Sequence, residues 1–543
     1  MTLLKEKLCK IIVGEVLDDE KTRLEYSHDA SLFEVKPKII VAPKNIDDFK
    51  NLIKFTNKNK GLSITIRSGG TDMTGGDLTE SIVVDVSKYF NHILEVKKDS
   101  ATVEPGVFYR DFEKETLKHG ALLPSYPASK DICTLGGMVA NNSGGEKTLF
   151  YGKTEDYVTS LNVILRDGKE YAIKPLNKKE LDKKLKLKGV EGQIYKEVYK
   201  LIEEHKDLIA AAKPKVSKNS AGYYLWNIWN GETFDLTKLF VGSQGTLGII
   251  SKISLKLVQP KAHSRLLVIF MRDLSQLAAI VGEILKYKPE SFESFDDHTL
   301  KLAARYSVDL IKLIKPKNIF LWLLQFLPEA IMIAKGGLPK LVLIAEFTGD
   351  SEKEVIEQTN KAMCSLKNFK IQSRITKNKE EAEKYWAIRR ESFNLLRHHI
   401  TNKRTAPFID DMIVRHDQLP QFLPELNKIL NQYNLTYTIA GHVGDANFHI
   451  IPLMDLRDPK TRIIIPKLTD KVYKLVFKYK GSITGEHNDG LIRSPYLKDM
   501  YGEEIYKLFE KIKKIFDPKN IFNPGKKVDS SLDYAMDHLR KNN

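Results

Sequence analysis

The chain contains little cysteine. Its 543 residues include only Cys9, Cys133 and Cys364, which lie far apart and form no CxxC pair. We therefore expect no disulfide framework, zinc ribbon or iron–sulfur cluster within the chain. Sparse cysteine also fits a reducing compartment, so we expect a cytoplasmic protein.

The chain also lacks the marks of export and of a membrane-spanning helix. Residues 1–22 contain no uninterrupted apolar core and no small-residue cleavage site, so we expect a short amphipathic helix there and no signal peptide. The longest apolar segment, residues 319–334, has 16 residues and is interrupted by Pro328 and Glu329. A spanning helix needs about 20 apolar residues. Two interpretations stay open for this segment: a buried helix or loop of the second domain, and a monotopic contact with the inner face of a membrane.

The sequence contains no nucleic-acid-binding motif, although basic residues outnumber acidic ones. Lys and Arg number 86 against 70 Asp and Glu, a net charge of +16. The lysines are spread along the whole chain, and no aromatic–basic motif accompanies them. We expect a solvated, lysine-rich surface and no nucleic-acid partner, and a peripheral membrane role is the alternative. The 42% hydrophobic and 29% charged residues are typical of a globular protein, and the length suits two or three domains.

Apolar periodicity divides the chain into two parts. Residues 39–43 predict a strand, and the helical spacing that follows predicts a helix with Gly61 as its C-cap. Two more strands and a helix near residues 108–119 follow, an order typical of an α/β arrangement. In the second half, residues 265–271 and 340–347 predict strands of a separate antiparallel sheet, with helices between and after them. A lysine-rich helix and a turn-rich tail close the chain.

Three glycine-rich segments stand out in the first half. Arg67–Gly76 (RSGGTDMTGG) follows a β-branched strand, Pro124–Gly145 carries two Gly-Gly pairs, and Gly242–Gly248 (GSQGTLG) enters a strand. Glycines let backbone N–H groups converge on a phosphate and let the backbone pass close to a large ligand. Each segment alone is a weak signal, and a simple turn is the alternative for the first. All three in this order predict a site for a large ligand.

Two histidines lie in a predicted hairpin. The sequence TYTIAGH-VGDA-NFHIIPL predicts two strands joined by a turn. If Val443 pairs with Phe448, His442 faces His449 with Cβ atoms about 5 Å apart, close enough to share a metal. Glu486 follows downstream in TGEHNDG. Two histidines and a carboxylate leave open positions on a metal for a substrate. The alternative is a pair of structural histidines beside a glycine turn.

The three loops resemble the FAD-binding domain of the vanillyl-alcohol oxidase and p-cresol methylhydroxylase superfamily. GHVGDANFH, GEHNDG and DPKNIFNPGK resemble its branch of D-lactate dehydrogenase, glycolate oxidase and D-2-hydroxyglutarate dehydrogenase. The resemblance covers nearly the whole chain and implies an α+β fold. It implies a two-subdomain FAD-binding domain of the p-cresol methylhydroxylase type at 1–260, an α+β substrate or cap domain with an antiparallel sheet at 261–495, and a C-terminal helical segment at 496–543 that packs back on the FAD domain.

The resemblance implies that the first loop holds the pyrophosphate of FAD. Covalent members of the superfamily carry a histidine near this loop, and Thr71 stands at the matching place, so we expect FAD without a covalent link. The residues expected to contact FAD lie in the three loops and the tail: Ser68, Gly69, Gly70, Thr71, Asp72, Thr74, Pro127, Thr134, Gly137, Asn141, Ser143, Gly144, Ile250 and Asn523.

The resemblance also implies a metal-assisted oxidation of a D-2-hydroxy acid to the 2-keto acid, with hydride transfer to the flavin. The implied ligands of one divalent metal, zinc or manganese, are His442, His449 and Glu486. His487 is the implied general base, since a metal beside the substrate hydroxyl lowers its pKa and a neutral imidazole takes the proton. The segment YWAIRRESF resembles a family element that supplies Arg389 for the substrate carboxylate. Arg390 is expected at the surface, and Arg404 is expected as a second anion contact.

Several positions depart from the family pattern. Ala446 replaces the second glycine of GDGN, Phe393 replaces a threonine of 2-hydroxyglutarate dehydrogenases, Ile451 replaces a polar residue, and no lysine matches cleanly. These differences weaken an assignment to 2-hydroxyglutarate.

Two other functions stay open: a non-redox flavoenzyme similar to alkylglycerone-phosphate synthase, and a flavin-bearing electron-transfer subunit of a larger complex. For an oxidising enzyme we expect electrons to leave through an iron–sulfur protein, an electron-transfer flavoprotein, a quinone or oxygen. The sequence leaves a homodimer open.

Overall fold

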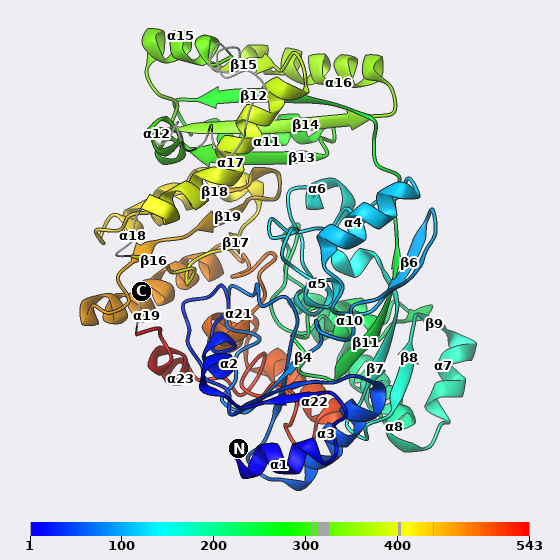
Figure 1. Cartoon of the computed structure of the whole chain (residues 1–543). Helices are drawn as coiled ribbons and strands as arrows, with labels where there is room; N and C mark the ends of the chain where they lie inside the picture. The colour runs from blue at the N-terminus through cyan, green and yellow to red at the C-terminus, as the bar shows by residue number, and fades with distance from the viewer. Residues whose placement is uncertain are drawn as a thin grey trace.

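Three main sheets organise the chain, and Figure 1 shows them from the blue amino-terminal sheet near the bottom to the green sheet at the top. Two sheets are built from residues before 260 and the third from residues after it. The computed structural model describes residues 2–305, 309, 311, 325–399, 403–437 and 439–541.

The first sheet contains a parallel core. Its order is β1 (Glu15–Leu17), β2 (Ile39–Ala42), β4 (Ile82–Asp85) and β3 (Ile64–Arg67). β4 runs parallel to both β2 and β3, and β1 joins β2 as an antiparallel edge. The runs IIVA and IVVD are buried throughout, as parallel strands covered on both faces require. Helix α3 (Ile46–Lys58) covers this sheet and is capped by the Asn45 side chain.

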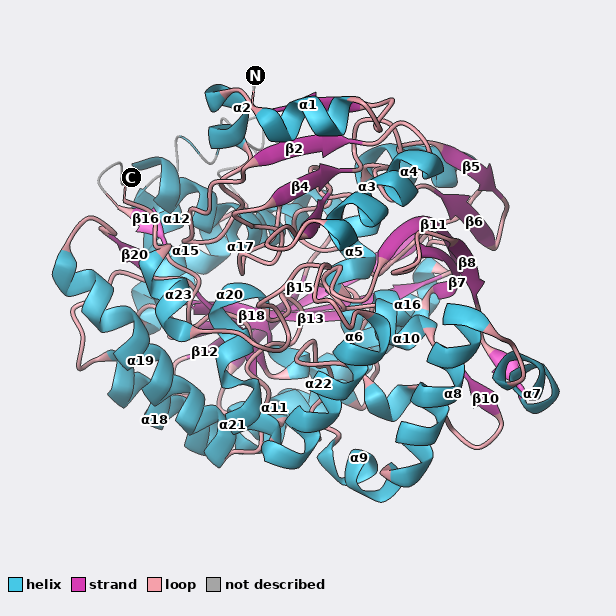
Figure 2. Cartoon of the chain, turned by 90° about the horizontal axis from the view of Figure 1, so that it is seen from below, coloured by secondary structure: helices cyan, strands magenta, loops and turns pink. Residues whose placement is uncertain are grey.

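The second sheet is antiparallel. Its order is β5 (Ile93–Val96), β6 (Ser100–Val103), β11 (Ile249–Lys256), β7 (Val158–Ile164) and β8 (Glu170–Ile173). Alternating burial along β11 places one face of the strand in the core. The helices that share this core are α4 (Tyr109–Lys118), α5 (Leu135–Asn141), α7 (Lys178–Leu185), α8 (Gly189–Glu204), α9 (Lys206–Ala212) and α10 (Thr237–Phe240). Figure 2 shows α8 below β7 and β8, with α7 next to α8.

The third sheet has seven antiparallel strands. Their order is β15 (Gln372–Ile375), β12 (His263–Met271), β14 (Leu341–Gly349), β13 (Ser291–Asp296), β18 (Ile439–His442), β19 (Asn447–Ile450) and β17 (Met412–Ile413). Successive residues of β12 and β14 enter different apolar clusters on the two faces. The predicted antiparallel sheet is confirmed.

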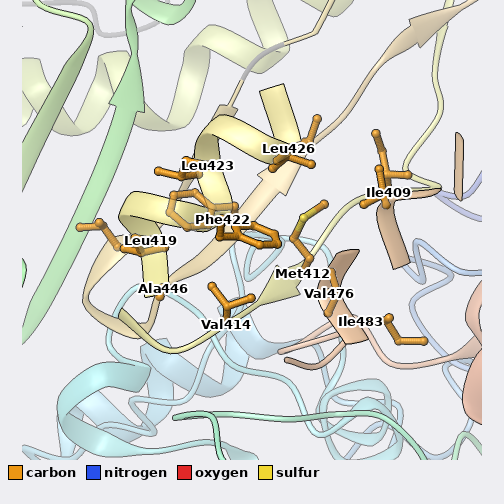
Figure 3. Packing of buried hydrophobic residues seen from close by; sticks show 14 of the residues in the cluster. Ile409, Met412, Val414, Leu419, Phe422, Leu423, Leu426, Ala446, Val476 and Ile483 are labelled. Atoms are coloured by element: carbon orange, nitrogen blue, oxygen red, sulfur yellow. The ribbon is translucent and has the colours of Figure 1, made fainter. Parts of the chain in front are cut away.

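Helices cover both faces of this third sheet. One face packs against α11 (Leu277–Leu285), α16 (Glu352–Ser365), α18 (Leu419–Leu430) and α19 (Pro459–Lys478). The other packs against α12 (Asp297–Arg305), α15 (Leu327–Gly336) and α17 (Lys379–His399). Figure 3 shows α18 inserting Leu419, Phe422 and Leu426 among Met412 and Val414, so β17 is anchored by apolar packing on one side.

The C-terminal region contacts the cores of all three sheets. Helix α22 (Glu503–Phe516) is amphipathic and joins the core of the second sheet, while Phe522 joins that of the first. After it, α23 (Leu532–Asp537) packs on the core below the third sheet. The loops that precede α22 contain the short helices α20 (Gly490–Arg493) and α21 (Leu497–Tyr501). The tail thus ties the amino-terminal half to the segment that carries Glu486 and His487.

Two local predictions are wrong. Residues 1–22 are not one helix, because α1 (Leu3–Cys9) ends early and β1 and α2 (Glu20–Glu25) follow. Val16, within this segment, is buried in the core of the first sheet, because pairing with β2 stabilises a strand there more than helix propensity stabilises a helix. Helix α3 ends with Asn59 as its C-cap, two residues before Gly61.

The apolar segment 319–334 lies partly outside the described residues. Its second half forms α15, in which Leu327 is 56% and Ile331 is 47% exposed. Glu329 turns inward and pairs with Arg374 and Lys384. The exposed side chains that the structure describes on α15 are therefore apolar. Among the described residues, no helix combines the length and the apolar character that crossing a bilayer requires.

Candidate active site

Three histidines and two carboxylates gather at one end of the third sheet. His442 ends β18, His449 lies in β19, and the loop before α20 supplies Glu486 and His487. Ligand atoms of His442, His449 and Glu486 lie within 4.8 Å of one another, and so do those of Asp410, His449 and His487. The ring centroids of His449 lie 5.2 Å from His442 and 5.0 Å from His487. Two overlapping sets of candidate metal ligands result.

The hairpin pairs differently from the prediction. Asn447 lies opposite His442, and Ala440, not His442, lies opposite His449. The predicted register is therefore wrong by two residues along one strand. Side chains alternate between faces with a period of two, so the histidines remain on one face as diagonal neighbours. In the turn, Ala446 has φ of 53°, a conformation that favours the glycine of the family pattern.

A carboxylate contacts Nδ1 of each imidazole. Glu293 of β13 lies 2.6 Å from His442 Nδ1, and Asp410 lies 3.0 Å from His449 Nδ1 and 2.6 Å from His487 Nδ1. Both carboxylates are buried. An imidazole held at Nδ1 keeps Nε2 available for a metal or a proton, as metal-binding histidines commonly do.

These carboxylates control protonation. Burial lowers the pKa of His442, but Glu293 and Glu486 outweigh it and raise this pKa to about 9. Burial also lowers the pKa of His487, but Asp411 and Asp410 raise it to about 9. Without a cation between them, both imidazoles are protonated at neutral pH. A divalent cation among these groups favours the neutral rings, because like charges repel.

Glu486 is held between two cationic groups. Its Oε1 pairs with Lys218, whose side chain is 1% exposed, and its Oε2 lies 3.4 Å from His442 Nε2. Lys218 Nζ also lies 3.6 Å from Asp445 Oδ2. Burial raises the pKa of Glu486, but His442 and Lys218 outweigh this effect and hold it well below the usual value. Glu486 is therefore ionised, as a metal ligand must be.

Asp411 fixes the loop that carries Glu486 and His487. Its Oδ2 accepts hydrogen bonds from Thr484 Oγ1 at 2.6 Å and from the N–H groups of Glu486 at 2.9 Å and His487 at 2.7 Å. Its Oδ1 accepts from Asn447 Nδ2 at 3.0 Å. The loop therefore has a set position relative to the hairpin that carries the other two histidines.

Two of the three arginines contact carboxylates. Arg389 Nη2 lies 3.1 Å from Glu293 Oε2, which joins this guanidinium to the histidine cluster. Arg390 instead binds Glu146 through Nε and Nη2. Arg404 lies in β16 (Arg404–Thr405), which pairs with β20 (Leu453–Met454), and among the described residues no hydrogen bond joins its side chain to the histidines. The buried Nε atoms of Arg389 and Arg404 have no hydrogen-bond partner among the described residues.

The first glycine-rich loop offers a row of unused backbone donors. The loop follows β3, and residues 68–73 are partly exposed. Among the hydrogen bonds of the described residues, none has the N–H of Ser68, Gly69, Gly70 or Thr71 as its donor. Gly70 has a positive φ of 64°. Successive N–H groups in such a turn form an anion-binding concavity, which suits a pyrophosphate.

Two residues predicted to contact the cofactor act within this loop. Thr74 is buried, and its N–H and hydroxyl both lie 2.5 Å from Asp72 Oδ1. Asp72 Oδ2 accepts from Gln244 of the third loop at 3.2 Å. Burial, and then the neighbouring Asp77, raise the pKa of Asp72. Asp72 and Thr74 therefore shape the first loop and connect it to the third.

The second loop lies against both the first loop and Glu486. Ser68 Oγ and Thr134 Oγ1 are 2.5 Å apart. Asn141 Nδ2 donates to the carbonyl of Glu486 at 3.2 Å, and a Cβ added to Gly144 would lie 3.3 Å from Glu486 Oε1. The chain thus brings the predicted flavin loops and the predicted metal ligands into contact.

The remaining predicted cofactor residues lie in the same region. Asn523 donates to the carbonyls of Gly76 at 2.8 Å and Gln244 at 2.7 Å, so it joins the tail to the first and third loops. Ser143 is buried, whereas the residues that keep partial exposure are Thr71, Pro127, Gly137, Asn141 and Ile250.

Sequence reasoning missed the buried charges that support this site. They are Lys218, Glu293, Asp410, Asp411 and Arg493. Arg493 is fully buried and donates to the carbonyl of Asp410 at 2.8 Å. Two adjacent aspartates inside the apolar stretch PFIDDMIV were a signal that could have been used, since buried carboxylates need partners. Glu293 gave no comparable signal.

The residues present fit both an FAD and a metal. Four free N–H groups in the first loop suit the pyrophosphate. Nitrogen and oxygen ligands from His442, His449 and Glu486 suit zinc or manganese. We prefer this set to the one containing Asp410, because Asp410 already contacts Nδ1 of two imidazoles.

Comparison with known families divides the chain in two. The FAD binding domain matches residues 37–173, and the C-terminal domain of the FAD linked oxidases matches residues 260–527. D-2-hydroxyglutarate dehydrogenase of Escherichia coli (strain K12) is 27% identical over 94% of this chain, and the chain spans about half of that relative, 50% of its length. Glycolate oxidase subunit GlcD of Bacillus subtilis (strain 168) is 28% identical over 96% of both chains.

Solved structures share the fold at low identity. The match to the 4-ethylphenol oxidase from Gulosibacter chungangensis spans 97% of this chain and 97% of that one, with a TM-score of 0.69 and 16% identity. The match to an alkyldihydroxyacetonephosphate synthase spans 96% of this chain and 84% of that one, with a TM-score of 0.64 and 15% identity. The predicted fold class is confirmed. The chain therefore contains the FAD binding domain and the C-terminal domain of the FAD linked oxidases, and it shares its fold with p-cresol methylhydroxylase, at a TM-score of 0.68 and 16% identity.

Proposed function

We propose that the chain oxidises a D-2-hydroxy acid to the 2-keto acid, with FAD as the hydride acceptor. The observation that carries the proposal is the contact between the flavin loops and the histidine–glutamate cluster, through Asn141 and Gly144 against Glu486. The names of the relatives, a D-2-hydroxyglutarate dehydrogenase and a glycolate oxidase subunit, support this substrate class. Bound FAD would accept the hydride from the α-carbon.

We propose His442, His449 and Glu486 as the ligands of one divalent metal, zinc or manganese. Such an ion would polarise the hydroxyl of a bound 2-hydroxy acid and lower its pKa. Glu293 and Asp410 orient the two imidazoles through Nδ1 and leave Nε2 to bind.

His487 is the proposed general base. Asp410 contacts its Nδ1, so its Nε2 is the atom that receives the substrate proton. The raised pKa of about 9 makes the resulting imidazolium stable beside Asp410 and Asp411. Before the reaction the ring must be neutral, which a nearby divalent cation favours. The balance between these carboxylates and the cation therefore sets the protonation of the base.

Arg389 is the proposed partner of the substrate carboxylate, and Arg404 the proposed second anion contact. Both have a buried Nε without a hydrogen-bond partner among the described residues. Arg390 is less suited, because Glu146 already occupies it through two nitrogens. Guanidinium binds carboxylate through two parallel hydrogen bonds, so an unfilled donor supports the assignment.

The other expectations complete the proposal. We propose FAD without a covalent link, because Thr71 stands where covalent members carry a histidine. The proposed division is an FAD domain at 1–260, a substrate domain at 261–495 and a C-terminal segment at 496–543. An iron–sulfur protein, an electron-transfer flavoprotein or a quinone is the proposed electron acceptor, in the cytoplasm or at the inner face of a membrane.

The non-redox alternative predicts a different flavin behaviour. Similarity to an alkyldihydroxyacetonephosphate synthase extends over 96% of the chain but concerns the fold, at 15% identity. A synthase of that kind would not bleach its flavin with a 2-hydroxy acid, and neither would an electron-transfer subunit without a working substrate site.

An anaerobic screen tests the proposed function. The FAD-loaded protein is mixed with D- and L-lactate, glycolate and D- and L-2-hydroxyglutarate, and the visible flavin absorbance is followed. We expect bleaching by at least one achiral or D-acid and none by the matching L-acid. Bleaching by L-acids alone would contradict the stereochemistry, and no bleaching by any acid would contradict the proposed reaction.

A further inference from the structure

Lys218 is a buried cation that sequence reasoning did not connect with the site. It lies between α9 and the segment that leads to β10 (Thr233–Phe234), far in sequence from the histidines. Its side chain is 1% exposed and pairs with Glu486 Oε1. Asp445 Oδ2 lies on the other side of the ammonium group, at 3.6 Å. A buried ammonium group with two carboxylates near it holds a set position, because leaving either unpaired is costly.

The two oxygens of Glu486 have different surroundings. Oε1 faces Lys218 and the backbone at Gly144, where an added Cβ would lie 3.3 Å away. Oε2 faces the imidazole of His442, with 3.4 Å between Oε2 and Nε2. Only Oε2 therefore points toward the other candidate ligands.

We infer that Lys218 is a positioning residue, which holds Glu486 so that it offers one oxygen, Oε2, to the metal. This inference rests on the proposed metal site. Lys218 keeps a hydrogen bond and a positive charge on Oε1, so that oxygen is not available as a second ligand. Glu486 would then bind the ion through a single atom and leave coordination positions open for the substrate oxygens.

Asp445 supports Lys218 from the hairpin. Its backbone carbonyl accepts a hydrogen bond from Ser217 Oγ at 3.1 Å, which joins the turn of the hairpin to the segment that carries Lys218. The lysine thus connects the turn between His442 and His449 to the glutamate ligand on a separate loop. Outer contacts of this kind typically change metal affinity about 10- to 100-fold when they are removed.

The test compares two buried lysines that approach the same loop. Lys218→Met removes the cation from the Glu486 carboxylate. Lys153→Met is the matched control, because Lys153 is also buried but donates to the carbonyls of Gly485 at 2.7 Å and Asn219 at 3.0 Å and to the hydroxyl of Ser220. The zinc dissociation constant is measured by competition with a chromophoric chelator, and FAD content and Tm report folding.

Lys218→Met is expected to weaken zinc binding about 10- to 100-fold with FAD still bound. Lys153→Met is expected to bind zinc as the unmodified chain does. Should Lys218→Met fail to load FAD, Lys218→Gln keeps a donor, loses the charge and carries the same expectation. Unchanged zinc affinity in a folded Lys218 variant would overturn the inference, as would equal losses in the Lys218 and Lys153 variants.

A double variant separates this inference from the metal site itself. In a Glu486→Gln background, Lys218→Met is expected to change zinc affinity little further, because its effect acts through Glu486. A full additional loss there would contradict the proposed route. If the unmodified chain and His442→Ala bind zinc equally weakly, the proposed metal site fails, whereas normal zinc binding by Lys218→Met alone rejects only the role of Lys218.

Discussion

Single buried carboxylates decide the chemistry of the imidazoles at this site. Glu293 and Asp410 contact Nδ1 atoms, and Asp411 holds the backbone of the loop that carries Glu486 and His487. None of the three is a proposed metal ligand. They set the orientation and the protonation of the proposed ligands and of the proposed base. Residues that contact metal ligands from outside usually act in this way.

Arg389→Ala is expected to raise KM for the hydroxy acid far more than Arg390→Ala. Losing a charged hydrogen-bonded contact costs about 1.5–3 kcal/mol, or roughly 10- to 100-fold in KM. Arg390 binds Glu146 and is half exposed, so its loss should have a small effect. Steady-state kinetics of both variants provide the comparison. Equal and small effects would refute the assignment of the carboxylate to Arg389.

Zinc binding is expected to release a proton from His442. Its raised pKa of about 9 stabilises the metal-free fold below the ordinary pKa of 6.5, and this contribution is lost as pH rises through 9. A ligand nitrogen must be unprotonated, so apparent zinc affinity should increase from about pH 7 toward 9 and then level off. Calorimetry in buffers with different ionisation enthalpies counts the protons. Affinity independent of pH in this range would show that His442 is not a ligand.

At the scale of secondary structure, the pattern of apolar residues was sufficient for the long elements. It gave β12 and β14 as continuous apolar runs, which are buried on both faces, and α11 and α22 through the apolar stripe that each helix buries. It did not give the register of the hairpin, since several pairings keep the histidines on one face. Residues 1–22 were wrong because α1 and α2 are short and the intervening strand depends on a partner distant in sequence, β2.

The outer face of α15 is expected to bind an anionic membrane surface. Leu327 is 56% and Ile331 is 47% exposed, and Glu329, the one acidic residue of α15, is paired inward. In the sequence, Lys315, Lys317 and Lys335 flank this segment, and apolar side chains beside basic residues suit anionic lipid. Sedimentation with phosphatidylglycerol vesicles at low salt should detect the chain, and Leu327→Glu with Ile331→Glu should abolish binding.

The control for this surface lies on α16. Ile356 is 40% exposed, and Ile356→Glu is expected to leave vesicle binding unchanged. If Ile356→Glu abolished vesicle binding as well, the added negative charge, and not the loss of the apolar face of α15, would explain the effect. No binding by the unmodified chain would contradict the membrane contact, and dimerisation through α15 would assign the face to a second copy.

At the scale of the whole molecule, the site forms where distant segments meet. Hydrogen bonds join the three glycine-rich loops, near residues 70, 141 and 244, to the tail near residue 523. The loop that carries Glu486 contacts the second of these loops through Asn141. Glycine-rich loops and a histidine hairpin could be found one by one from the sequence. Their convergence could not, because it depends on Lys218, Glu293 and Asp410, whose sequence surroundings resemble ordinary strands and loops. A family resemblance was needed to connect the loops to FAD.

The purified chain is expected to be yellow and to release its flavin on acid or heat denaturation. Thr71 offers no imidazole for a covalent link, and the free N–H groups of the first loop bind by hydrogen bonds alone. Filtration after denaturation separates the two outcomes. Flavin retained on the denatured polypeptide would contradict this prediction.

We expect the oxidation to need a metal bound by His442, His449 and Glu486, whereas the flavin is expected to be held by the glycine-rich loops. The most direct measurement is the anaerobic rate of flavin reduction by the best D-2-hydroxy acid, recorded beside metal content before chelation, after chelation and after reloading. Chelation should remove the metal, keep FAD and stop reduction, and reloading should restore it. His487→Ala should keep both groups yet reduce about 10²- to 10⁴-fold more slowly. An unchanged rate of flavin reduction in the metal-free protein would show that the oxidation does not need the metal.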